Sequence, residues 1–253
     1  MDTTEQIGLK HRFLKNLSKG LGLIAEKIEF MAVDSQPIPK LPKAYTDIFA
    51  GQALYKVIND FEVQTVLDVG SGEGLHSDVF LKAGKVVTSI DYGDSVYFKK
   101  KRGDQECIVA DFNEHKFETQ FDCLWCSHVL EHQVDVQRFL TNAHNNLKEG
   151  GVLAVTVPPL KHVIVGGHVS LWNAGLLLYR LVLAGFNCKD ASVLCYGYNI
   201  SVVVVKDSVD VSNKIEYDSG DIRKIKNYLP NGIKFHSNAV DDLFYGRIHK
   251  LNW

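Results

Sequence analysis

The stretch Val66-Leu-Asp-Val-Gly-Ser-Gly-Glu-Gly74 decides the fold of this chain. Its apolar start predicts a buried β-strand over residues 65–69, and its glycines predict a tight turn that opens a helix at Leu75. Glycines in such a turn let the backbone approach a ligand closely, and the helix N-terminus directs N–H groups toward it. Strand, glycine-rich turn and helix together indicate a nucleotide-binding α/β fold.

The spacing of these glycines differs from two common phosphate-binding turns. A dinucleotide fingerprint reads G-x-G-x-x-G, but after Gly70 and Gly72 the third glycine comes at Gly74, and Leu75 takes the fingerprint position. No G-K-[ST] sequence follows, as a P-loop requires. A carboxylate inside the strand end, Asp68, is also unexpected beside a pyrophosphate.

An alternation of strands and helices continues after the turn. Further strands are predicted at residues 86–90, 107–109, 121–126, 152–157, 191–195 and 200–205, and helices at 45–61, 75–83, about 135–150 and 170–183. The last two strands are separated by only four residues, which permits an antiparallel pair but no parallel crossover. We therefore expect an α/β, Rossmann-like, doubly wound and mostly parallel seven-stranded sheet with an antiparallel terminal hairpin.

Length and composition limit the organisation of the chain. Its 253 residues, 45% of them hydrophobic, suit one large domain with modest appendages. We expect an N-terminal appendage with a proline-containing linker over residues 1–42, the main domain over 43–206 and a C-terminal extension over 207–253. No apolar run could span a membrane and no cleavable leader is apparent, so a cytoplasmic location is expected. The net charge of -2 argues against nucleic acid as a partner, and nothing indicates an oligomeric state.

Two acidic residues follow the next strands. Asp91 ends the second strand, where a carboxylate can accept hydrogen bonds from both hydroxyls of a ribose; the alternative is an ordinary turn acid. Asp111 follows the third strand and could accept from an adenine amino group with Phe112 beside the ring, or could be a simple loop acid.

In this order the motifs resemble those of the class I S-adenosylmethionine-dependent methyltransferases. They are residues 66–74, Asp91, 110–112, 121–132 and 147–153, and the resemblance covers roughly residues 45–206. The HVLEH form is similar to the branch that acts on small molecules, quinones and glycans. The resemblance implies S-adenosyl-L-methionine as the cofactor. The binding residues that it implies are Asp68, Gly70, Ser71, Gly72, Gly74, Asp91, Tyr92, Asp111, Phe112, Ser127 and His128.

The pattern His128-x-x-Glu131-His132 also matches the H-x-x-E-H motif of a class of zinc peptidases. Zinc ligation of that kind needs both histidines on one continuous helix. Here strand-like sequence runs to Cys126, and the helical period begins only near Asp135. We therefore expect these residues in a connection at the ligand-binding edge of the sheet, and no metal; a zinc-dependent hydrolase stays a minor alternative.

A hydroxyl acceptor usually needs a base, and histidine suits that task near neutral pH. Two histidines, His162 and His168, follow the fifth strand, and His132 is a third candidate. We favour His168, because Gly166-Gly167 before it and the helix after it would aim it at the pocket. A locally hydrogen-bonded residue at the helix entry is the alternative.

The acceptor is less defined than the cofactor. Enzymes that methylate adenine or glutamine nitrogen carry [N/D]-P-P-[Y/F] after the fourth strand, where this chain has Cys126-Ser-His-Val129. We expect O-methylation of a small molecule, with a sugar or sugar nucleotide of surface-polysaccharide synthesis as the favoured class. Two other functions stay open: a catalytically inactive methyltransferase-like binding protein and an NAD-dependent oxidoreductase.

Overall fold

The computed structural model describes residues 17, 38–101, 106–237 and 242–253. The chain divides into two compact units, Met1–Pro39 and Lys40–Trp253, and every element considered below belongs to the second. Most of the predicted N-terminal appendage, residues 1–42, therefore lies outside the described residues.

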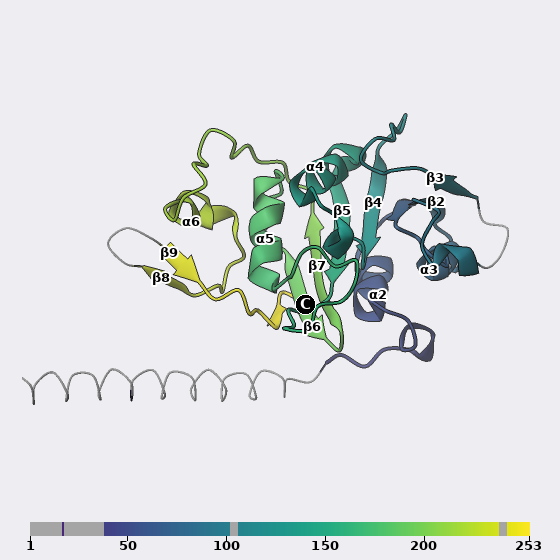
Figure 1. The fold of residues 1–253 in the computed structure, drawn as a ribbon, viewed down its shortest axis with the longest axis horizontal. Helices are drawn as coiled ribbons and strands as arrows, with labels where there is room; N and C mark the ends of the chain where they lie inside the picture. The colour runs from purple at the N-terminus through teal and green to yellow at the C-terminus, as the bar shows by residue number, and fades with distance from the viewer. Residues whose placement is uncertain (1–16, 18–37, 102–105, 238–241) are drawn as a thin grey trace, which may run out of the picture. The chain divides into compact units, whose positions relative to one another are not determined.

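An eight-stranded sheet organises the second unit within the described residues (Figure 1). Its order is β10-β6-β7-β5-β4-β1-β2-β3, and the pairs among β1 to β5 are parallel. The strands are β1 (Thr65–Val69), β2 (Val86–Asp91), β3 (Cys107–Val109), β4 (Phe121–Ser127), β5 (Leu147–Val157), β6 (Ser192–Tyr196), β7 (Asn199–Val205) and β10 (Lys250–Leu251). The predicted fold class is confirmed, including the antiparallel hairpin of β6 and β7. An eighth strand, β10, joins the edge of the sheet in addition to the seven predicted.

Helices cover both faces of this sheet (Figure 1). Side chains alternate along each strand, so Leu67 and Leu124 face one core while Val66 and Trp125 face the other. The first core includes residues of α4 and α5, and the second includes residues of α2 and α3. The helices are α2 (Gly51–Asp60), α3 (Leu75–Lys82), α4 (Val136–Asn146), α5 (Ala174–Leu183) and α6 (Asp221–Ile225), with short 3-10 turns η1 (Lys43–Tyr45), η2 (Phe98–Lys100), η3 (Leu130–His132) and η4 (Lys226–Tyr228). Within the described residues, none of them combines the length and apolar character needed to cross a bilayer.

Two helix boundaries differ from the prediction. The helix α4 ends at Asn146 instead of near residue 150, and the Lys206 ammonium donates to the carbonyls of His144 at 2.7 Å and Leu147 at 2.8 Å, at the helix end. The helix α5 begins at Ala174 instead of after Ser170, because the side chain of Asn173 accepts a hydrogen bond from Leu176 N as an N-cap.

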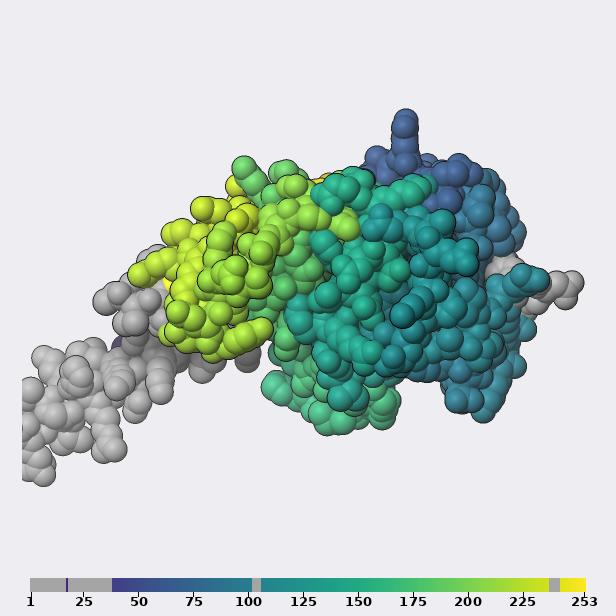
Figure 2. Space-filling view, turned by 90° about the horizontal axis from the view of Figure 1, so that it is seen from above, coloured from purple at the N-terminus to yellow at the C-terminus, as the bar shows by residue number. Residues whose placement is uncertain are grey.

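The residues after 206 pack onto the same unit. Besides β10, they form a small separate hairpin of β8 (Phe235–Ser237) and β9 (Asp242–Phe244). Gly175 N, in the first turn of α5, donates to Gly246 O at 2.8 Å. The space-filling view shows the yellow C-terminal residues lying directly against the green part of the chain (Figure 2).

This close approach predicts an effect of a single methyl group. A Cβ at Gly175 would lie 2.4 Å from Gly246 Cα and 2.8 Å from the Phe244 ring. Alanine gains about 1 kcal/mol of helix propensity over glycine, but we expect the clash to outweigh this gain. Gly175→Ala should lower the free energy of unfolding by about 1–3 kcal/mol in urea denaturation. Gly166→Ala is the control, because its Cβ would meet nothing within 4 Å; equal stability of the two variants would contradict the packing described.

Candidate cofactor and acceptor site

The glycine-rich turn lies between β2 and the segment that follows β4. Gly70, Gly72 and Gly74 have φ angles of 72°, 52° and 81°, a left-handed conformation that glycine adopts without steric cost. Gly70 N donates to Ile90 O at 2.8 Å, and a Cβ at Gly70 would lie 2.1 Å from Val129 Cγ2. Glycine at this position therefore lets the turn and the HVLEH segment pack in direct contact.

Asp68 lies on β1, just before the turn. Its side chain is buried and accepts a hydrogen bond from the Ser77 hydroxyl at 2.6 Å, and Ser77 in turn lies 2.9 Å from the Ser89 hydroxyl. Burial raises the pKa of Asp68 to about 7, although the bond from Ser77 opposes the rise. A cationic group brought close to this carboxyl would favour its ionised form, as the ammonium end of an amino-acid ligand would.

Asp91 holds the turn against the end of β2. One carboxylate oxygen accepts from Gly72 N at 3.0 Å, and the other accepts from Gly93 N at 2.9 Å. Each carboxylate oxygen keeps a further lone pair, so the group can still accept bonds from a ribose. The hydroxyl of Ser71, within the turn, lies 3.5 Å from Cys107 Sγ.

The residues near the predicted adenine position differ in their exposure. Asp111 accepts from Asn113 N at 2.7 Å. Partial burial and a hydrogen bond to Asp111 raise the pKa of Tyr92, whose side chain is 54% exposed. Phe112 is buried, with its ring 5.0 Å from that of Phe139. Tyr92 thus offers an open aromatic surface beside Asp111, whereas Phe112 belongs to the core; their contact with a cofactor stays a prediction.

His128 lies at the exit of β4 with a φ of 55°, in the left-handed region. Its Nδ1 lies 3.2 Å from Glu131 Oε1, and its Nε2 lies 2.9 Å from Asn199 Oδ1. The ring also contacts the ring of Phe49, at 5.2 Å, and stacks nearly parallel to that of Tyr198, at 6.0 Å. Burial acts to lower the pKa of His128, but the hydrogen bonds to Glu131 and Asn199 and the Glu131 charge outweigh it and raise the pKa.

Ser127, the other predicted residue of this segment, ends β4. Its hydroxyl is buried, and it has no hydrogen-bond partner among the described residues. An unpaired buried hydroxyl costs free energy, so a bound ligand that completes this bond would be stabilised there.

Two of the three candidate bases lie together, and the third lies at the surface. His132 Nδ1 lies 2.8 Å from Gly167 O, and a carbonyl oxygen only accepts, so Nδ1 carries a proton. His132 Nε2 lies 3.9 Å from Glu131 Oε1. The His168 ring packs edge-on against that of His132 at 5.0 Å. His162 is exposed on the same loop. The structure therefore brings His132 and His168 together and leaves His162 at the surface.

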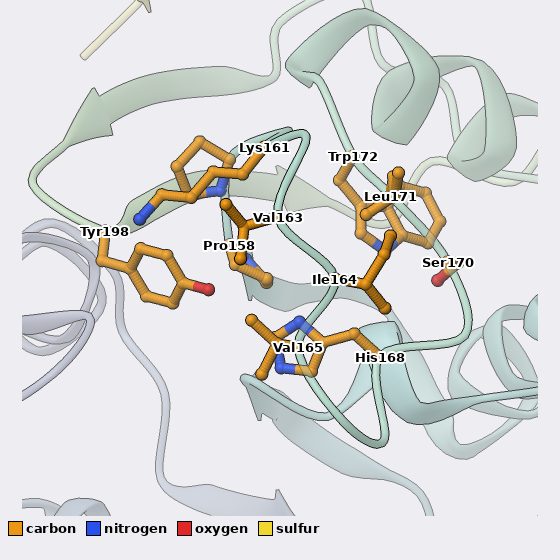
Figure 3. A pocket seen from close by; sticks show the side chains of 11 residues that line it. Pro158, Lys161, Val163, Ile164, Val165, His168, Ser170, Leu171, Trp172 and Tyr198 are labelled. Atoms are coloured by element: carbon orange, nitrogen blue, oxygen red, sulfur yellow. The ribbon is translucent and has the colours of Figure 1, made fainter.

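A small pocket lies beyond the end of β5 (Figure 3). Tyr198 of the hairpin and His168 of the β5–α5 loop point toward it, with Trp172 at its buried side, and the Lys161 ammonium lies 4.4 Å from the centre of the Tyr198 ring. The free volume is about 10 Å³, enough for one water molecule. In the described conformation this pocket does not hold a larger molecule.

Sequence reasoning missed the aromatic and amide side chains around His128 and the pocket, namely Phe49, Trp172, Tyr198 and Asn199. They come from the segment before α2, the β5–α5 loop and the hairpin. The short link between β6 and β7 was the one available signal, because it predicts a tight turn at one end of these two strands.

The residues of the H-x-x-E-H pattern do not lie on one helix. Glu131 and His132 lie on the three-residue turn η3, α4 starts only at Val136, and His128 faces Asn199. The geometry of a zinc peptidase is therefore absent from this segment. A different set, Glu131, His132 and His168, places its ligand atoms within 4.8 Å of one another, and its nitrogen and oxygen donors suit zinc.

We expect this cluster to hold no resident metal, because the Glu131 carboxylate already faces the His128 ring nitrogen at 3.2 Å, and the raised pKa of His128 favours a compensating imidazolium. Elemental analysis of the purified full chain should give well below one zinc per molecule. A stoichiometric amount that is lost in His168→Ala and kept in His162→Ala would contradict this expectation and assign the cluster as a metal site.

Comparison with known proteins gives a match over the strands that build this site. The family model described as "Methyltransferase domain" matches residues 67–155. A ubiquinone biosynthesis O-methyltransferase of Paramagnetospirillum magneticum is 37% identical over 102 residues, 38% of this chain and 41% of that protein. A protein of the same name from Coxiella burnetii is 34% identical over 95 residues, 35% of this chain and 41% of that protein. The chain thus spans about two fifths of the length of these curated relatives.

Solved structures share the fold at low identity. An S-adenosylmethionine-dependent methyltransferase of Archaeoglobus fulgidus superposes with a TM-score of 0.53 and 15% identity, over 61% of this chain and 92% of that one. The 1,6-didemethyltoxoflavin-N1-methyltransferase of Burkholderia thailandensis, solved with S-adenosylhomocysteine, gives 0.52 and 18%, over 66% and 82%.

Proposed function

Because this chain is a class I S-adenosylmethionine-dependent methyltransferase in its fold and in its matched motifs, we propose that it methylates a hydroxyl oxygen of a small molecule. The observation that carries the proposal is the convergence of the glycine turn and His128 through the Gly70–Val129 contact. This contact brings the predicted cofactor residues and the candidate bases to one edge of the sheet.

The described residues fit the cofactor. Asp91 retains acceptor capacity for the ribose, Asp68 can pair with an ammonium group, and Tyr92 offers an exposed ring beside Asp111 for the adenine. The backbone of the turn can approach the ligand closely, because its glycines carry no side chains. When bound, S-adenosylmethionine supplies a methyl group on a positively charged sulfur.

The ribose assignment predicts a loss of cofactor affinity in Asp91→Ala. Hydrogen bonds to a charged group contribute about 1.5–3 kcal/mol each, so the Kd for S-adenosylmethionine should rise at least tenfold in calorimetry. Asp94→Ala removes an exposed acid three residues away and should bind as the wild type does. An unchanged affinity of Asp91→Ala for S-adenosylmethionine, with its fold verified by circular dichroism, would contradict the ribose assignment.

Among the histidines, His132 has the geometry of a general base. The Gly167 carbonyl fixes the proton on Nδ1, so Nε2 can take the proton of an acceptor hydroxyl as its oxygen bonds to the methyl carbon. In that transfer the bound cofactor would supply the methyl carbon and would be left as a neutral thioether. The sequence favoured His168; here His168 packs against the edge of His132, and we assign it to holding that ring.

The acceptor class is the finer part of the proposal. The curated relatives are named for ubiquinone biosynthesis and for O-methylation, which supports oxygen as the methylated atom. The predicted sugar or sugar-nucleotide acceptor has no support from these relatives. Valine, isoleucine, proline and tryptophan side chains dominate the pocket beyond β5, with Lys161 at its edge, so we favour a largely apolar hydroxylated molecule.

The base assignment predicts a graded response of turnover. Loss of a general base lowers kcat about 10²–10⁴-fold, and we expect this of His132→Ala, with an unchanged Kd for S-adenosylmethionine. His168→Ala should lower kcat by about tenfold, and the surface residue His162 serves as the matched control, whose alanine variant should keep wild-type turnover. The assay is release of S-adenosylhomocysteine across quinol, glycan and amine acceptors. Full kcat in His132→Ala would remove it from the mechanism.

The same assay separates the remaining alternatives. Binding of S-adenosylmethionine without turnover on any acceptor would favour the catalytically inactive binding protein. Binding of NADH, seen as a change in its fluorescence, with none of S-adenosylmethionine would favour the oxidoreductase.

A further inference from the structure

Asn199, the first residue of β7, joins three segments of the chain. Its side chain is buried, and its Oδ1 accepts from His128 Nε2 at 2.9 Å and from Ala50 N at 3.2 Å. Its Nδ2 donates to Tyr196 O at 3.2 Å, which fixes the orientation of the amide. One amide oxygen therefore connects the exit of β4, the start of α2 and the β6–β7 turn.

Both donors to this oxygen have an unfavourable backbone conformation. Ala50 and His128 have φ angles of 54° and 55°, in the left-handed region that costs a residue other than glycine roughly 1–2 kcal/mol. Such conformations persist when the surroundings determine them, and they gather at functional sites. Here the backbone N–H of Ala50 and the ring Nε2–H of His128 donate to the same acceptor, Asn199 Oδ1.

A second contact reinforces the position of the segment before α2. Phe49 O lies 2.9 Å from His76 Nε2, on α3 directly after the glycine turn, and the Phe49 ring packs on His128 at 5.2 Å. The Tyr198 ring stacks on His128 at 6.0 Å. The rings of Phe49 and Tyr198 thus both contact the His128 ring, which Asn199 holds by a hydrogen bond.

We propose that Asn199 is a positioning residue for methyl transfer, which keeps the proton on His128 Nε2 and holds the Phe49–Ala50 segment beside it. The proposal rests on the proposed function, because it needs methyl transfer at this edge of the sheet. The neutral amide oxygen of Asn199 accepts from the imidazole without placing a second carboxylate near Glu131. An aspartate substituted at the same position would place one there.

The groups that face His128 define what a titration would report. Burial opposes the charged form of His128, and Glu131 on η3 and Asn199 on β7 favour it. From the hairpin it meets Tyr198, over whose ring the Lys161 ammonium lies. His76 has a pKa lowered to about 4, chiefly by burial, and is neutral above that pH, so Glu131 and Asn199 dominate the His128 titration near neutrality.

The experiment compares Asn199→Asp and Asn199→Ala in the full chain, with Asn59→Ala as the control. Asn59 is an exposed asparagine whose amide also donates to a backbone carbonyl, Tyr55 O at 2.7 Å. The first readout is the titration midpoint of His128 by imidazole NMR. We expect it to rise by about one pH unit in Asn199→Asp, since a facing carboxylate favours the imidazolium, and to fall in Asn199→Ala. The second is hydrogen exchange of the Ala50 amide, about tenfold faster in Asn199→Ala and near wild type in Asn199→Asp.

Turnover supplies the third readout. Asn199→Ala should lower kcat about tenfold or more and, because His128 is a predicted cofactor residue, should also raise the Kd for S-adenosylmethionine, whereas Asn59→Ala should change neither. An unchanged His128 midpoint in both variants, or full kcat in Asn199→Ala, would overturn the proposal. If Asn199→Ala does not fold, the midpoint in Asn199→Asp decides. Absence of methyl transfer by the wild type would refute the proposed function instead. The two spectroscopic readouts need no turnover, so they test the role of Asn199 separately.

Discussion

The contact between Gly70 and Val129 is the constraint on which the site depends. A methyl group at Gly70 would lie 2.1 Å from the Val129 side chain, so no other residue fits without moving β1 from β4 at their carboxyl ends. That proximity sets the glycine turn beside the segment from His128 to His132. The predicted cofactor residues and the candidate bases share an edge of the sheet because these two backbones pack without an intervening side chain.

Two buried carboxyl groups of the site differ in the partners that compensate their charge. Asp68 has hydroxyl partners but no facing cation among its described contacts, and burial raises its pKa to about 7. Glu131 is buried too, but it lies 3.2 Å from the His128 ring nitrogen, where its hydrogen bond and charge help to raise the pKa of His128 against the effect of burial. One acid is therefore ready to respond to a cationic ligand, while the other is compensated within the protein.

The sequence predicted the fold well, because its strands, glycine turn and helices depend on local patterns, whereas the cofactor roles of the residues at the turn stay predictions. The strand–turn–helix at residues 65–82 and the antiparallel link at residues 197–198 follow from glycine spacing and loop length. The connection containing His128 and His132 was also placed correctly between β4 and α4. The surroundings of His128 could not be predicted, because its partner Asn199 is 71 residues away and its left-handed φ has no signal in the sequence. The helix start at Ala174 was missed for a local reason, since the cap of Asn173 outweighs that of Ser170.

The reversed direction of β7 has a consequence for how this fold can diversify. Because β7 runs against β5, with Ile200 opposite Val157, the β6–β7 turn lies at the carboxyl edge where ligands bind. This turn and the β5–α5 loop reach the pocket from strands that take no part in the glycine turn. Insertions and substitutions in these two loops can thus reshape the pocket while the strand–turn–helix at residues 65–82 keeps its sequence, so these two parts of one sheet edge can change independently.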